Sequence, residues 1–371
     1  MDTNTPFEIF LVATPGLEDV LCAEAQELGF AGAAVVPGGV SFQGGWPDVW
    51  RANLVLRGAT RVLARIGAFR AFHLAQLDKR ARKFPWADLL NPDVPVRVET
   101  TTKRSKIYHA GAATQRIETA LRESLGATIS PEAEVVIKVR IDDDMVTISL
   151  DTSGVSLHKR GHKEAVNKAP MRETMAAMFL RQMGFDGSQT VVDPMCGSGT
   201  FVIEAAEIAA GLLPGRSRSF AFEKLRNFDA DVWAAQRTSG TTKTPTAHFY
   251  GSDRDAGAIK MSRANADRAG VTEFTSFQTL SVSDLTPPDG PPGIVIVNPP
   301  YGARIGNKRP LFAAYGALGQ TLSARFSGWR VGIITTDNSL ARASALPFLP
   351  LGPSVAHGGL KVHLYRTEAL K

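Results

Sequence analysis

The spacing of apolar and polar positions divides the chain into two parts with different periodicities. In the first part it predicts strands at 7–12 and 94–100, helices at 17–28 and 109–125, and a hairpin over 134–151 that turns at 142–144. Residues 51–69 mix helical and strand character and receive no firm assignment. Strand–helix alternation that ends in a hairpin is typical of a small α+β module rather than half of a Rossmann fold.

The second part alternates regularly between short apolar strands and longer helices. Strands are predicted near 190–193, 248–251, 274–280, 294–297 and 331–335, and helices begin near Thr200, Asp255 and Pro310. A further helix is predicted from Ala169-Pro170-Met171-Arg172-Glu173, since proline is favoured in a first turn. The pattern indicates an α/β domain with a doubly wound parallel sheet. Between the two parts, residues 152–168 lack periodicity, as a linker or a functional loop would.

Composition narrows the class of protein. With 371 residues, 44% of them hydrophobic and 21% charged, the chain is expected to fold into two or three domains. No apolar run approaches the roughly 18–20 residues that span a bilayer, and the first residues lack a signal-like core, so a cytoplasmic protein without membrane association is expected. Cys22 and Cys196 stand in unrelated contexts, and no cluster of His, Cys, Asp and Glu has metal-ligand spacing, so neither a disulfide nor a metal is expected.

Positive charge is concentrated upstream of the second part. The net charge is +6 and the isoelectric point about 9.4. Three basic clusters occur, at 79–83, 103–106 and 158–163. Each alone could be a solvated face, but three in one region of a basic chain favour contact with phosphates. The predicted RNA-binding residues are Lys103, Arg104, Lys106, His158, Lys159 and Arg160.

The loop after the first strand of the α/β part has the sequence DPMCGSGT, residues 193–200. Gly197 and Gly199 allow the backbone to approach a ligand and turn into a helix. The third glycine of a dinucleotide fingerprint is missing, and Asp193 would repel a phosphate but attract an ammonium or hydroxyl group. The loop therefore favours S-adenosylmethionine over a nicotinamide dinucleotide, the alternative being a mere tight turn. The predicted cofactor contacts here are Asp193, Pro194, Cys196, Gly197, Gly199 and Thr200.

Two further carboxylates follow the next strands. Asp253 ends the second strand, where a carboxylate can accept both hydroxyls of a ribose. Asp255, two residues later, is predicted to cap the following helix instead. Asp284 follows the third strand and could accept the amino group of an adenine.

The stretch VNPPYG, residues 297–302, places an amide and an aromatic ring directly after a buried strand. Asn298 and the Pro299 carbonyl could accept the two N–H groups of a nucleobase amine, localising its lone pair, while Tyr301 stacks on the base. A simple strand terminator would explain the two prolines but not the flanking Asn and Tyr. The predicted catalytic residues are Asn298, Pro299 and Tyr301. Such a site favours direct transfer to an amine over a covalent role for Cys196.

These motifs resemble the class I amino-methyltransferases. More closely, the chain is similar to large-subunit ribosomal RNA guanine-N2 methyltransferases that carry an N-terminal THUMP domain. The resemblance extends to SLHKRG at 156–161, APMRE at 169–173, and PG at 214–215 followed by FAFEK at 220–224. His162 departs from the pattern, because these proteins usually have tyrosine there.

The resemblance implies a four-part organisation. It comprises an N-terminal ferredoxin-like region at 1–60, a THUMP RNA-binding domain at 61–154, a basic linker at 155–168 and an S-adenosylmethionine-dependent methyltransferase domain at 169–371. The implied reaction is methylation of the N2 amine of a flipped-out guanine in 23S ribosomal RNA. Transfer RNA guanine, an amine of DNA, and a non-catalytic RNA-binding assembly factor are the alternatives. The sequence does not indicate the oligomeric state.

Overall fold

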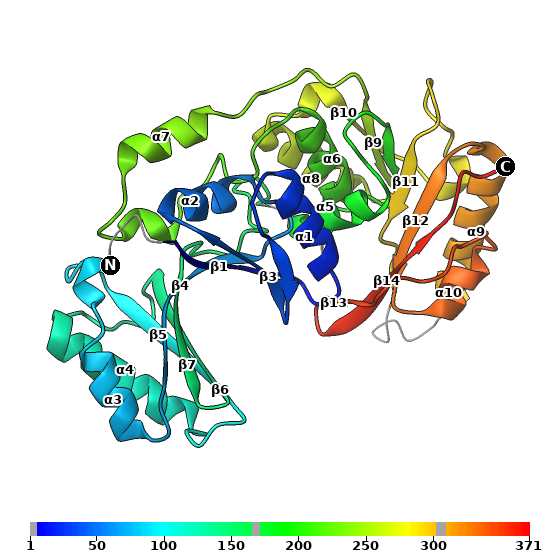
Figure 1. Ribbon diagram of the computed structural model, residues 1–371. Helices are drawn as coiled ribbons and strands as arrows, with labels where there is room; N and C mark the ends of the chain where they lie inside the picture. The colour runs from blue at the N-terminus through cyan, green and yellow to red at the C-terminus, as the bar shows by residue number, and fades with distance from the viewer. Residues whose placement is uncertain (1–5, 165–170, 302–308) are drawn as a thin grey trace. The chain divides into compact units, whose positions relative to one another are not determined.

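The computed structural model describes residues 6–164, 171–301 and 309–371. Contacts divide the chain into two compact units. The first unit comprises residues 1–13, 21–157 and 218–239, and the second comprises residues 14–20, 158–217 and 240–371 (Figure 1). Each unit is built on one seven-stranded sheet.

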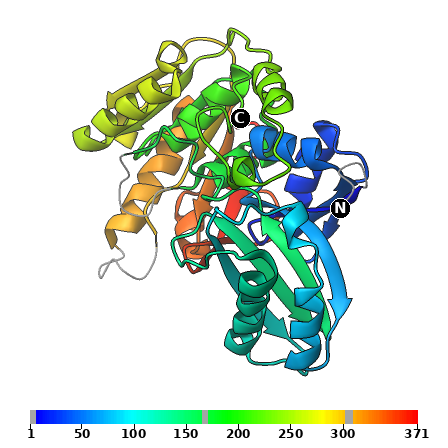
Figure 2. The same ribbon diagram turned by 90° about the vertical axis from the view of Figure 1, so that its left-hand side faces the viewer.

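The sheet of the first unit has the order β2-β3-β1-β4-β7-β6-β5. Its strands are β1 (Phe7–Val12), β2 (Ala34–Val36), β3 (Gly39–Gly44), β4 (Arg61–Arg70), β5 (Val96–Lys103), β6 (Val135–Asp142) and β7 (Met145–Asp151). β5 and β6 are parallel, and the other neighbours are antiparallel. The helices are α1 (Glu18–Glu27), α2 (Trp46–Val55), α3 (Leu74–Arg82), α4 (Ala110–Leu125) and α7 (Ala230–Thr238). α3 and α4 lie side by side against the β5 end of the sheet (Figure 2).

Most elements predicted for this unit are confirmed. β1, α1, β5, α4 and the β6–β7 hairpin occur where the pattern placed them, and the hairpin turns at Asp143-Asp144, both with positive φ. The unassigned stretch 51–69 contains the end of α2 and most of β4. β2, β3, α3 and α7 were not predicted; the packing of α7 depends on residues that are distant in sequence, such as those of α2.

The sheet of the second unit has the order β10-β9-β8-β11-β12-β14-β13. Its strands are β8 (Val191–Asp193), β9 (Phe249–Asp253), β10 (Thr275–Thr279), β11 (Ile294–Val297), β12 (Arg330–Thr335), β13 (Val355–His357) and β14 (Leu360–Arg366). The helices are α5 (Glu173–Gln182), α6 (Thr200–Ala209), α8 (Ala256–Ala269), α9 (Arg309–Arg325) and α10 (Asn338–Ala343). The five central predicted strands are confirmed as parallel neighbours.

The doubly wound α/β class is therefore confirmed, but the sheet is mixed. The unpredicted strand β14 runs antiparallel to β12 and forms a hairpin with β13. An antiparallel hairpin needs only a tight turn, and Gly358 and Gly359 provide one with positive φ. The predicted helix start at Ala169-Pro170 lies outside the described residues, and α5 begins at Glu173.

Residues 218–239 lie between α6 and β9 in the chain but pack in the first unit. Phe222 stacks 6.1 Å from Trp50 of α2, measured between ring centroids, and contacts Trp233 of α7 edge-on at 5.0 Å. This segment falls within the 169–371 range expected for the methyltransferase domain, yet its aromatic side chains complete the core of the other unit. The sequence-based boundaries at residues 60, 154 and 168 stay predictions.

Candidate active site

Three strand ends carry the predicted chemical groups to one edge of the second sheet. β8 lies between β9 and β11, and all three are parallel, so their carboxyl ends share that edge. Asp193 ends β8, Asp253 ends β9, and Asn298 directly follows β11. In doubly wound sheets, ligands bind at this edge, next to the reversal of strand order. The structure thus brings these three predicted residues together.

The glycine loop from β8 to α6 is held in place by α8. The Ser262 hydroxyl donates to the Gly197 carbonyl over 2.9 Å, and the Asn265 amide donates to the Ser198 carbonyl over 3.0 Å. Gly199 is the N-cap of α6 with φ +84°, and an added Cβ would lie 3.1 Å from Ser262. Glycine is required there for both conformation and space. An added Cβ on Gly197 would meet no atom within 4 Å, so the loop exposes an open backbone surface.

Asp253 connects this loop to β9. Its Oδ2 accepts from the Gly197 N–H over 3.1 Å and its Oδ1 from the Asp255 N–H over 3.0 Å. Each carboxylate oxygen has a second lone pair, and the side chain is only half-buried, so it can still accept hydroxyl donors. Asp255 caps α8 by accepting from the Gly257 N–H over 2.8 Å, which confirms the capping role predicted for it. Asp284 is exposed and lies in the short helix that follows β10. β10 is the neighbour of β9 in the sheet.

Asp193 is a buried carboxyl group with an altered acidity. It is 2% exposed, and its Oδ1 accepts from the Met195 N–H over 3.1 Å. Burial raises the pKa of Asp193 to about 8; the charge of Asp253 adds to the rise, and the Met195 hydrogen bond opposes it. A cation placed nearby would favour the ionised form. The carboxyl group is therefore suited to a ligand that carries an ammonium group.

Cys196 has the properties of a packing residue. Its thiol is buried, with Sγ 3.8 Å from the Ser262 hydroxyl. Burial raises the pKa of this thiol well above its usual value, and the charge of Asp193 adds to the rise. A protonated thiol is a poor nucleophile, which argues against covalent chemistry at Cys196.

Asn298 and Tyr301 follow β11, whose four residues are fully buried. The Asn298 Oδ1 atom is buried and has no hydrogen-bond partner among the residues that the structure describes. An unpaired buried acceptor costs about 1–3 kcal/mol, so a ligand donor at this point would remove that penalty. The Tyr301 hydroxyl lies 3.0 Å from Nδ1 of His357 in β13, and burial raises the pKa of Tyr301 to about 12. Pro299 is buried, and Gly302 lies outside the described residues.

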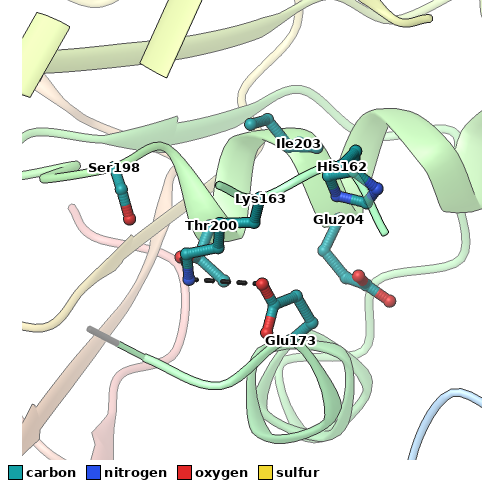
Figure 3. A pocket seen from close by; sticks show the side chains of 7 residues that line it. All are labelled: His162, Lys163, Glu173, Ser198, Thr200, Ile203 and Glu204. Carbon is teal, nitrogen blue, oxygen red and sulfur yellow. Dashed lines mark hydrogen bonds and ion pairs between the residues drawn. The ribbon is translucent and has the colours of Figure 1, made fainter. Parts of the chain in front are cut away.

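Thr200 is the first residue of α6 and follows the glycine loop directly. Its hydroxyl accepts from the Lys163 ammonium over 2.8 Å, and Lys163 also contacts Glu173 of α5 at 3.3 Å (Figure 3). The cavity beside these groups measures about 10 Å³, too small for a nucleoside or an amino acid. The Thr200 hydroxyl is thus already occupied by Lys163, whereas its N–H lies in the first turn of α6; the predicted contact of Thr200 with the cofactor stays a prediction.

The comparisons with known proteins agree with this geometry. Residues 160–347 match the family model described as "RMKL-like, methyltransferase domain", and residues 8–63 match the model described as "RlmL ferredoxin-like domain". The first match alone covers just over half of the chain. The chain belongs to the RMKL-like methyltransferase family.

Solved structures resemble this RMKL-like methyltransferase over nearly its whole length. A possible methylase from Clostridium difficile 630 is 28% identical with a TM-score of 0.88, and 99% of each chain is covered. SMU.472, a proposed methyltransferase complexed with SAH, is 26% identical with a TM-score of 0.89, again over 99% of each chain. TrmN from Thermus thermophilus, at 21% identity and a TM-score of 0.77 over 98% and 100% of the two chains, shares the fold. The family and fold inferred from the sequence are confirmed, as is S-adenosylmethionine as the cofactor.

The basic linker is partly built into the methyltransferase unit. Arg160 is 2% exposed and pairs with the buried Glu204 of α6 at 3.2 Å. This placement differs from the phosphate-facing role predicted for Arg160, because a buried guanidinium is not available at the surface. Burial and neighbouring cations lower the pKa of the half-buried His158 to about 4, so it is uncharged at neutral pH. Lys159 is exposed, and its predicted contact with RNA stays a prediction.

Sequence reasoning missed two groups near the site. Lys163 belongs to the basic cluster at 158–163, but its charge alone did not indicate that it would bind Glu173 and Thr200. His357 is separated from Tyr301 by 56 residues, and no motif connects them. Among the described residues, no group of three or more His, Cys, Asp or Glu could hold a metal ion. The described part of the chain also has no helix long and apolar enough to cross a membrane.

Proposed function

We propose that this protein transfers a methyl group from S-adenosylmethionine to the exocyclic N2 amine of a guanine in 23S ribosomal RNA. The carrying observation is the buried, unpartnered Oδ1 of Asn298, placed at the sheet edge where the glycine loop and Asp253 meet. An acceptor without a donor in the described structure fits an incoming N–H. An aromatic amine provides such a donor.

Different residues of this chain would bind the cofactor and the base. Asp253 would hold the ribose, Asp284 would accept from the adenine amino group, and the open backbone of the glycine loop would pass beneath the cofactor. Bound S-adenosylmethionine supplies an electrophilic methyl group. Asn298 Oδ1 and the Pro299 carbonyl would orient the amine, and the Tyr301 ring would stack on the base. The proton of the amine can leave after transfer, so no strong general base is required.

RNA is favoured as the polymer by the N-terminal part of the chain. Residues 8–63 match a ferredoxin-like domain of RlmL-type proteins, and the exposed basic loop at 103–106 can contact phosphates. We also propose that residues 61–154 form a THUMP domain and that the protein acts in the cytoplasm. DNA adenine is the alternative raised by a relative described as a predicted N6-adenine-specific DNA methylase from Listeria monocytogenes, 28% identical over 98% of this chain.

Methyl transfer to defined nucleic acids tests the proposal. Purified protein with radiolabelled S-adenosylmethionine would be offered 23S ribosomal RNA, transfer RNA and double-stranded DNA, and the labelled nucleoside would be identified by mass spectrometry. N2-methylguanosine in 23S RNA is expected. If the label appears only in transfer RNA or in DNA adenine, that nucleic acid is the substrate and the proposed one is wrong. If no polymer is labelled, the result favours a non-catalytic assembly factor.

A further inference from the structure

The first unit carries an exposed aromatic and basic surface at one end of its sheet. Three segments meet there: the end of β4 with the start of α3, the 103–108 loop after β5, and the β6–β7 turn (Figure 1). Backbone hydrogen bonds join them, since the Ala71 N–H donates to the Asp144 carbonyl over 3.0 Å and the Asp143 N–H donates to the Lys103 carbonyl over 3.2 Å. The Lys106 N–H also donates to the Asp144 carboxylate over 2.8 Å. The three segments therefore form one connected surface.

Each segment presents a large apolar side chain to solvent. Tyr108 is 83% exposed, Phe72 41% and Met145 36%. The Lys106 ammonium lies 5.0 Å from the centroid of the Phe72 ring, within cation–π distance. The Tyr108 carbonyl accepts from the Thr102 hydroxyl over 2.9 Å, which fixes the backbone from which the ring projects. Single exposed apolar side chains are common on protein surfaces, but three that gather on connected segments beside a cation indicate an interaction site.

The positive charge of this surface favours a nucleic-acid partner over an apolar protein partner. Lys103, Arg104 and Lys106 are all exposed. Asp142 is already paired with Arg104 at 2.9 Å and with Arg140 at 2.7 Å, and these two hydrogen bonds lower the pKa of Asp142 to about 2. Its carboxylate is therefore neutralised locally. An apolar protein partner would offer no anion to Lys103 and Lys106, whereas unpaired RNA offers bases for the rings and phosphates for these cations.

We propose that Tyr108 and Phe72 stack on unpaired bases of an RNA whose phosphates contact Lys103 and Lys106. We call Phe72, Lys103, Arg104, Lys106, Tyr108 and Met145 the tip patch. This inference rests on the proposed RNA substrate. It adds that the first unit recognises single-stranded RNA and not only the shape of a duplex. A duplex buries its base faces, so it cannot use the rings.

Equilibrium binding of the full chain to a labelled unpaired RNA oligonucleotide, without S-adenosylmethionine, tests the proposal. Tyr108→Ala and Phe72→Ala should each weaken binding by roughly 5- to 100-fold, with little change in salt dependence. Tyr108→Phe should retain parental affinity. Lys103→Ala should instead reduce the slope of log affinity against log salt by about 0.7, the value for one phosphate of a single strand. Val35→Ala, which alters an exposed apolar residue of β2, is the matched control.

A second readout reports stacking directly. An oligonucleotide that contains 2-aminopurine should lose fluorescence on binding the parent and Tyr108→Phe, but not Tyr108→Ala. Parental affinity and quenching in both alanine variants would overturn the proposal and leave the patch to a protein partner or to solvent. Because binding is measured without methyl transfer, this failure is distinct from failure of the proposed function, which would appear as an absence of transfer by the parent protein.

Discussion

At the residue scale, the site depends on polar atoms whose environments differ sharply. Asp253 is half-buried and accepts two backbone N–H groups, whereas Asp193 is buried and accepts one. Two carboxyl groups at neighbouring strand ends thus differ in burial and in the hydrogen bonds that they accept. This difference suits one of them to hydroxyl groups and the other to a cation.

Asp193→Asn should change how stability depends on pH. Burial raises the pKa of Asp193 to about 8, so the folded protein keeps a proton that the unfolded chain releases near pH 4. This contribution to stability is fully present below about pH 4, decreases as pH rises between the two pKa values and is lost above about pH 8. Asparagine does not titrate, so the melting temperature of the variant relative to that of the parent should rise between pH 5 and pH 8 and then level off. Melting curves without cofactor test this, and a difference that does not vary with pH would contradict it.

The Tyr301 hydroxyl should contribute to positioning the ring. Because it lies 3.0 Å from His357 Nδ1, Tyr301→Phe and an alanine at His357 should remove the same interaction. A double-mutant cycle on the single-turnover rate should give a coupling energy of about 0.5–1.5 kcal/mol. Additive effects would show that the hydrogen bond does not orient the ring.

At the element scale, α6 joins the cofactor loop to the linker. Its first turn receives the glycine loop, and its buried Glu204 pairs with Arg160. Because α6 contains both features, the linker segment 158–163 is expected to act on the shape of the cofactor loop. The basic cluster there is thus partly structural.

Arg160→Ala should destabilise the protein by roughly 3–5 kcal/mol, because the buried Glu204 carboxylate would lose the guanidinium that lies 3.2 Å from it. Lys159→Ala, which changes the exposed neighbouring cation, should alter stability by far less. The pair Arg160→Met with Glu204→Gln should recover part of the loss. Chemical denaturation of the three variants tests this. Parental stability of Arg160→Ala with weakened RNA binding would return Arg160 to the role first predicted for it.

The sequence predicts the parallel core of the second unit well, because β8, β11 and β12 are short buried apolar runs that end in recognisable turn sequences. It also predicts Asp193, Asp253 and Asn298 as neighbours, since parallel strands end at one edge. The β13–β14 hairpin was not predicted, although Leu360, Val362 and Leu364 of β14 alternate with polar residues as in a strand. The packing of residues 218–239 in the first unit could not be predicted, because it depends on aromatic contacts with Trp50. Nor does charge alone separate buried Arg160 from exposed Lys159.

At the scale of the whole molecule, each unit has a distinct chemical surface. The first unit presents the tip patch, and the second presents the sheet edge with the glycine loop and Asn298. A net charge of +6 favours association of the chain with a polyanion. We therefore expect that RNA capture and methyl transfer can be impaired separately.

Single-turnover transfer by Asn298→Ala, with saturating cofactor and RNA, tests the central claim most directly. The variant should fold and bind S-adenosylmethionine as the parent does, because Asn298 Oδ1 has no partner among the described residues. Asp253→Ala is the matched control and should weaken cofactor affinity by about tenfold or more instead. Loss of an aligned acceptor should lower the Asn298→Ala rate by roughly 10²–10³. A rate equal to that of the parent would contradict the account and show that other residues hold the methyl acceptor.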